Sequence, residues 1–93
     1  MAHFAITNFT TNEVSQVIVI DNKDLPAYGA FPQAEQAGRE MIINWGIMPA
    51  GHTAYQCSYS GSFRGYYPGE GWKYNPDTDE FVPPPIQIPE VGP

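Results

Sequence analysis

The stretch "HFAITNFTTNEVSQVIVID" (residues 3–21) decides the fold class, because two runs rich in β-branched and aromatic residues flank a polar cluster of Asn and Thr. This pattern predicts a β-hairpin with strands in residues 3–7 and 14–21. The run from Val17 to Ile20 shows no alternation of polar and apolar side chains. It therefore predicts a strand covered on both faces, either by the rest of the domain or by another subunit.

One amphipathic helix is expected from Pro32 to Trp45. The segment "PQAEQAGREMIINWG" has a proline in its first turn, apolar residues at helical spacing and a terminal glycine. Glu35 and Arg39 lie four residues apart, a spacing that favours an ion pair on the helix surface. Gly38 is expected to cost about 1 kcal/mol relative to alanine.

The second half of the chain reads as further strands and an arm. "TAYQCSY" (53–59) alternates as a strand does, and residues 60–81 predict short strands bent by glycines. The tail "PPPIQIPEVGP" (83–93) contains five prolines and cannot lie in a central sheet. The sequence thus predicts a small α+β domain in residues 1–82, with a mostly antiparallel sheet and one helix, followed by an extended proline-rich arm in residues 83–93.

Composition limits the classes of function. The 93 residues are 42% hydrophobic but only 15% charged, against a usual charged share of about 25%, which suggests that a partner covers part of the surface. The net charge is −6 with four scattered basic residues, which disfavours binding to nucleic acid. With no signal-peptide pattern and no apolar window long enough to span a bilayer, synthesis in the host cytoplasm and no membrane contact are expected.

A metal site is the first chemistry to consider in "GWKYNPDTDEFVPPP" (71–85). Asn75, Asp77 and Asp79 fit the first, third and fifth positions of a calcium loop, but Glu80 stands where glycine is needed and Ile86 where a carboxylate is needed. A hairpin turn fits this segment better, with Asn and Asp side chains bonding the turn backbone. No metal site is predicted.

Catalysis is also not predicted. His3, His52 and the single Cys57 have no ligand or base at a recognisable spacing, and the glycine-rich stretch "GSFRGYYPGEG" lacks the lysine of a phosphate loop. We expect neither an enzyme nor a cofactor.

Aromatic side chains offer the largest contact area, and we expect them to serve the core and a subunit interface. An alternative from another class is an adhesin that stacks glycans on the aromatic cluster. The arm should supply apolar anchors to a neighbouring subunit. The predicted partner-binding residues are Phe63, Tyr66, Tyr67, Trp72, Ile86, Ile88 and Val91.

The segments "MAHFA", "VSQVIVIDNKDL" and "QCSYSGSFRGYYPGEGWKYNPDTDEFVPPP", in that order, resemble a group of short virion structural proteins of tailed bacteriophages, especially cyanophages. The chain departs from that pattern at residues 26–32 and 46–54. The resemblance implies a structural protein of the virion without enzyme activity. We expect a capsid decoration or cement protein that forms a homo-oligomer and binds other virion proteins, the major capsid protein first among them. A tail, neck or fibre component is the alternative.

Overall fold

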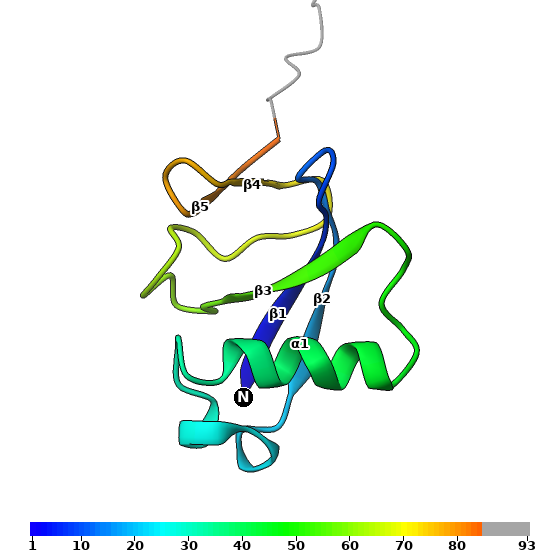
Figure 1. Ribbon diagram of the computed structural model, residues 1–93. Coiled ribbons are helices and arrows are strands. Elements are labelled where there is room, and N and C mark those ends of the chain that lie inside the picture. Colours follow the sequence, from blue (N-terminus) through cyan, green and yellow to red (C-terminus); the bar gives the residue numbers. More distant parts are fainter. Residues whose placement is uncertain (85–93) are drawn as a thin grey trace, which may run out of the picture.

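A three-stranded antiparallel sheet lies at the centre of the fold, in the order β2-β1-β3 (Figure 1). The structure is a computed structural model that describes residues 1–84. In the turn between the first two strands, Asn8 Oδ1 accepts hydrogen bonds from the backbone N–H groups of Thr10 and Thr11. The predicted N-terminal hairpin is confirmed. The three strands are β1 (Ala2–Asn8), β2 (Val14–Ile20) and β3 (His52–Cys57).

The one α-helix of the described residues, α1 (Glu35–Asn44), crosses one face of this sheet (Figure 1). Its start lies three residues after the predicted one, because residues 31–34 form turns and Ala34 is the N-cap. The helix ends one residue before the predicted Trp45, and Gly46 follows with a φ of 76° that suits glycine. Two short 3₁₀ turns, η1 (Asn22–Asp24) and η2 (Pro26–Gly29), connect β2 to the segment before α1.

A first apolar core fills the space between α1 and the sheet. Phe4 is fully buried at its centre, directly beneath Gly38 of the helix. A Cβ atom at position 38 would lie 2.2 Å from Phe4 Cζ, so only glycine lets the helix approach this closely. Gly38 therefore has a packing role that the helix propensity alone does not reveal. The core comprises Ala2, Phe4, Ile6, Ile20, Leu25, Ala34, Ile42 and Ala54.

A second apolar core lies on the opposite face of the sheet, beneath a two-stranded hairpin. Its strands, β4 (Lys73–Asn75) and β5 (Glu80–Val82), pair antiparallel. At the turn, Asn75 Oδ1 accepts a hydrogen bond of 3.0 Å from the backbone N–H of Asp77. The hairpin interpretation of "NPDTDE" is therefore confirmed. The core comprises Ala5, Val14, Cys57, Tyr74 and Phe81.

The glycine-rich segment 58–72 differs from its prediction. It contains no strand, only an isolated bridge between Gly65 and Phe81, and it runs as a loop from β3 to the β4–β5 hairpin (Figure 1). Six glycines of residues 1–84 have a positive φ, three of them in this segment at positions 61, 65 and 71. Such backbone turns too often to stay in register with a neighbouring strand. The expectation of short strands in residues 60–71 is wrong.

Within one copy, β2 is less covered than the Val17–Ile20 run predicts, and its coverage by another subunit stays a prediction. Within residues 1–84 the most buried strand is β1, because it is the middle strand and both cores pack against it. β2 lies at the edge of the sheet, where Val17 and Ile18 are half-buried and Val19 is exposed. An unbroken apolar run thus marks an edge strand here.

The predicted fold class is confirmed: the domain is α+β, with antiparallel sheets and one α-helix packed on the central sheet. The predicted arm in residues 83–93 falls almost entirely outside the described residues, and so do Ile86, Ile88 and Val91.

Candidate interaction surface

Arg64 joins three parts of the fold that are far apart in sequence. From segment 58–72 its guanidinium group pairs with the Glu35 carboxylate at the start of α1 and, at 2.9 Å, with Asp79 in the β4–β5 turn. The same group lies over the Phe31 and Tyr55 rings, 4.8 and 5.3 Å from their centroids. Only 8% of the Arg64 side chain is exposed, so this is a buried cation with its partners in place.

The charges around Arg64 shift the pKa values of its neighbours. Burial acts to lower the pKa of Arg64, but the hydrogen bonds and charges of Glu35 and Asp79 outweigh it and raise that pKa. Burial acts to raise the pKa of Asp79, but hydrogen bonds from Tyr74 and Arg64 lower it overall. Burial and the Asp79 carboxylate raise the pKa of Tyr74 to about 12. Arg64 and Asp79 are therefore charged, and Tyr74 neutral, at physiological pH.

The ion-pair group also closes the outer edge of β3. Glu35 Oε2 accepts a hydrogen bond of 2.8 Å from the Gln56 backbone N–H, and Arg64 donates one of 3.1 Å to the Gln56 carbonyl. Arg39, which forms the predicted pair with Glu35 at 3.7 Å, donates to the Ala54 carbonyl at 2.9 Å. Charged side chains thus occupy the positions that another strand would use, which is how native proteins prevent pairing at a sheet edge.

The aromatic residues predicted to bind partners do not form one platform. Tyr66 is 73% exposed, whereas Tyr67 and Trp72 are half-buried against the second core. Phe63 is half-buried and stacks on Phe31, with 4.1 Å between ring centroids. Among residues 1–84 no ring contact joins Tyr66 to Tyr67 or Trp72. Of these three rings, Tyr66 therefore offers the most free surface, and the glycan-binding alternative stays a prediction.

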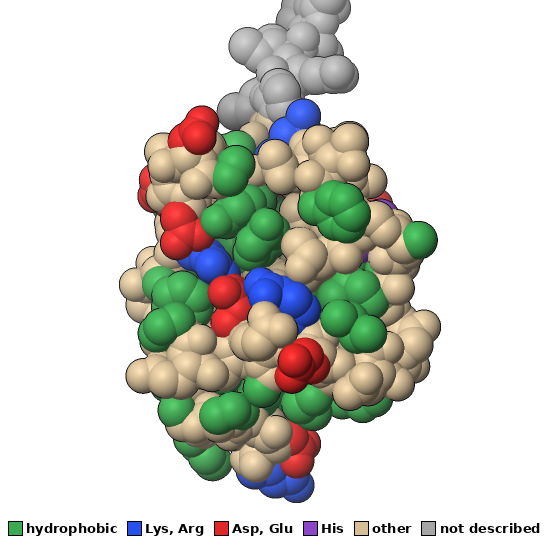
Figure 2. Space-filling view, in the orientation of Figure 1, with side chains coloured by type: hydrophobic (Ala, Val, Ile, Leu, Met, Phe, Trp, Pro, Cys, Tyr) green, Lys and Arg blue, Asp and Glu red, His purple; other side chains and the backbone are tan. Residues whose placement is uncertain are grey.

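Other apolar side chains are exposed that the sequence analysis did not select. Three of them lie in the last turn of α1 and just after it, and Trp45 is 51% exposed; they are Ile43, Trp45 and Ile47. Ile43 follows the buried Ile42 directly and therefore points to another side of the helix. The helical spacing of the apolar residues could have predicted this exposure from the sequence. Figure 2 shows several separate hydrophobic patches on the face in view, with red and blue side chains between them. The remaining exposed large apolar residues in the part of the chain that the structure describes are Met1, Phe9, Val19, Tyr28, Tyr59, Tyr66 and Val82.

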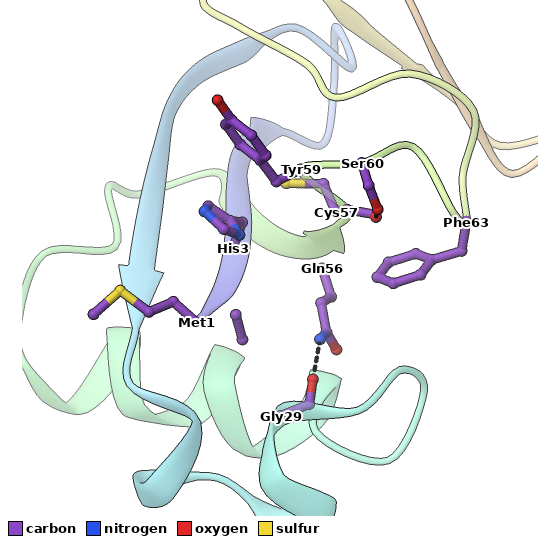
Figure 3. A pocket seen from close by; sticks show the side chains of 10 residues that line it. Met1, His3, Gly29, Gln56, Cys57, Tyr59, Ser60 and Phe63 are labelled. Atoms are coloured by element: carbon purple, nitrogen blue, oxygen red, sulfur yellow. Dashed lines mark hydrogen bonds between the residues drawn. The ribbon is translucent and has the colours of Figure 1, made fainter.

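An open groove of about 610 Å³ lies beside the N-terminus (Figure 3). Met1 and His3 line one side, and Tyr59 and Phe63 come from the chain after β3. Gln56 at its floor is 2% exposed and donates from Nε2 to the Gly29 carbonyl at 2.8 Å, while its Oε1 has no partner in residues 1–84. The volume is in the range of small-molecule pockets.

Thiol chemistry is not supported in this groove. Cys57 lines it but is 3% exposed, and burial raises the pKa of the thiol to about 12 despite the charge of Arg64. His52 lies at the other end of β3, about 17 Å from Cys57 along a strand of this length. Within the described part of the chain no three His, Cys, Asp or Glu side chains are grouped to hold a metal ion.

Comparison with models of protein families, with curated proteins and with solved structures found no match to the chain. In residues 1–84, no helix has the length and apolar character needed to cross a bilayer.

Proposed function

We propose that the chain is a structural component of a phage particle, a capsid decoration or cement protein that binds other virion proteins and forms a homo-oligomer. The observation that carries the proposal is the exposure of large apolar side chains on a domain this small, with Ile43, Trp45 and Ile47 in close succession. Such side chains leave water when a neighbouring subunit covers them.

The composition and the arrangement of charges support the same role. A surface poor in charge suits a protein that is largely surrounded by other subunits. The best-formed polar group, around Arg64, connects α1, β3 and the β4–β5 turn, and therefore serves the fold. The resemblance to short virion proteins of tailed phages suggests that the assembly in which the chain takes part is the phage particle.

Copy number in the virion tests the proposal. We expect quantitative mass spectrometry of purified phage particles to find this chain at hundreds of copies per particle, in a fixed ratio to the major capsid protein. A ratio of only a few copies per particle would instead assign it to the tail, neck or fibre. Complete absence from purified particles would overturn the structural role.

The exposed apolar residues just after the end of α1 provide a second test. Trp45→Ser together with Ile47→Ser should leave the chain folded, because the two residues are 51% and 44% exposed and belong to neither core. The same double variant, supplied during infection in place of the natural chain, should incorporate into particles less than the matched control Tyr28→Ser, which lies on η2. A chain cut after Pro83 should likewise fold but fail to incorporate if residues 84–93 act as an arm.

A further inference from the structure

The two edges of the central sheet differ in how many of their backbone groups are hydrogen-bonded. The β3 edge is closed by Glu35, Arg39 and Arg64, as described above. The β2 edge is closed only at its first residue, where Val14 donates to the Trp72 carbonyl at 2.7 Å and accepts from Gly71 N–H at 2.9 Å. After Val14, the outward side of β2 has no hydrogen-bond partner among the described residues.

The register identifies which β2 groups face outward. Asn8 N–H donates to Glu13 and Phe9 N–H donates to Gly51, so even-numbered residues of β1 bond β2 and odd-numbered residues bond β3. Phe4 is opposite Ile18, whose backbone groups therefore face β1. By alternation, the N–H and C=O groups of Val17 and Val19 point away from the sheet.

This open edge carries no charge. From Val14 to Ile20 the strand has only Ser15 and Gln16 as polar residues, and the charged residues nearest in the sequence are Glu13 and Asp21 at its ends. Lysine, proline and bulges are the usual protection of exposed edges, and the only irregularity here lies near Ser15, before the open part. An edge with these properties can pair with another strand.

We propose that the β2 edge pairs antiparallel with β2 of a second copy of this chain, around a two-fold axis at Ile18. In this register Ile18 faces Ile18 of the partner subunit, and Val17 and Val19 of one copy face the partner's Val19 and Val17. Two apolar side chains meet at each of these positions, and the outward groups of Val17 and Val19 form hydrogen bonds across the axis. The two central sheets become one sheet of six strands.

A second copy fits this edge better than a charged partner does. Each copy carries a net charge of −6, which opposes association of two copies, so their contact is favoured where acidic residues are absent. The part of β2 that is open, from Val17 to Ile20, meets that condition. A two-fold axis also requires a self-complementary strand, which Val17, Ile18 and Val19 provide because valine matches valine across the axis.

Sedimentation velocity of the purified full-length chain tests the proposal. We expect the wild type to form a dimer at about 100 μM and Val19→Lys to raise the dimer Kd at least tenfold, because lysine at an edge strand opposes pairing. The matched control is Val82→Lys on β5, since Val19 and Val82 are similarly exposed, at 45% and 40%. Circular dichroism should show that both variants keep the wild-type fold. A monomeric wild type, or equal dimerisation of Val19→Lys, would overturn the proposal.

A disulfide tests the register. Ile18 and its two-fold mate form a non-hydrogen-bonded pair with about 4.5 Å between Cα atoms, which a disulfide can bridge. Ile18→Cys should therefore give a covalent dimer on mild oxidation, whereas Ile43→Cys, exposed on α1, should not. The native thiol does not compete, because Cys57 is buried. A wild-type dimer without cross-linking at position 18 would overturn this register and with it the proposed contact.

The last control concerns residues 85–93, which could occupy the same edge. A chain that ends at Pro84 should dimerise as the full-length chain does, and loss of the dimer in this shortened chain would identify the tail as the occupant and overturn the β2–β2 contact.

The inference deepens the proposed assembly role and rests on it for biological meaning. Because it is measured on purified protein, its failure is distinguishable from absence of the chain in virions.

Discussion

Replacement of Gly38 by alanine sets two effects of opposite sign against each other. In an isolated helix Gly38→Ala should stabilise by about 1 kcal/mol through helix propensity. In this fold the new Cβ would lie 2.2, 2.4 and 2.9 Å from three ring atoms of Phe4. Phe4 is fully buried in the first core and cannot move aside without displacing other core residues. Overpacking of this kind costs about 1 to 3 kcal/mol, and three contacts below 3.0 Å place it at the upper end.

We therefore expect Gly38→Ala to lower the unfolding free energy by about 2 kcal/mol, which corresponds to a Tm lower by about 10 °C for a domain of this size. Urea denaturation and a thermal melt of the same sample measure both quantities. Asn44→Ala, at the exposed end of α1, is the control for propensity and should change stability by less than about 0.7 kcal/mol.

A double-mutant cycle separates the clash from other causes. Phe4→Leu shortens the side chain beneath Gly38, so Gly38→Ala should be tolerated better in that background, with a coupling energy of about 1 to 2 kcal/mol. A Gly38→Ala variant as stable as the wild type, or no coupling to Phe4→Leu, would refute the conclusion that glycine is required for the close approach of helix and sheet.

Four further predictions follow from the polar groups. Arg64→Met should lower the unfolding free energy by about 3 kcal/mol in urea denaturation, since it removes the closer of the two cations beside the partly buried Glu35 carboxylate and also the partner of Asp79; a loss below 1 kcal/mol would contradict this. The raised pKa of Tyr74 contributes stability that is present below about pH 10 and lost as the pH rises toward about 12, so Tyr74→Phe should flatten the alkaline arm of a stability–pH profile. Asp77→Asn should change stability by less than about 0.5 kcal/mol, and calcium should not raise Tm in either form. Cys57 should resist iodoacetamide at neutral pH until the chain is unfolded; alkylation of the native protein at the rate of a free thiol would disprove its burial.

Local patterns were sufficient for the parts of the fold that local physics determines. The turn at Asn75 has side chains that bond their own backbone, and the alternation of Tyr55 and Cys57 with Ala54 and Gln56 matches a strand with both faces covered. The helix was located to within three residues. In each case the deciding interactions join residues that are close together in the sequence.

Contacts between residues far apart in the sequence could not be predicted from such local patterns. An apolar run such as Val17–Ile20 indicates strand, but its position at the edge or in the centre depends on which strand pairs outside it. Arg64 and Glu35 are 29 residues apart, and no periodicity connects them. Trp72 and Tyr67 were predicted as contact residues from their type, whereas the second core takes up much of their surface. Asp79 is a further example. The sequence placed it in a turn, but it did not show that the Asp79 carboxylate accepts hydrogen bonds from Arg64 and Tyr74.

The closed edge of β3 limits how far sheets of this protein can grow. A sheet with two unprotected edges adds copies without end and forms a fibre, whereas a sheet with one protected edge stops after a single addition. The protection at β3 comes from Glu35 and Arg39 on α1 and from Arg64 on a loop, so it exists only while these segments are docked. Partial unfolding that releases α1 would therefore convert a self-limiting sheet into one able to polymerise, and aggregation should begin at the denaturant concentration where the helix detaches.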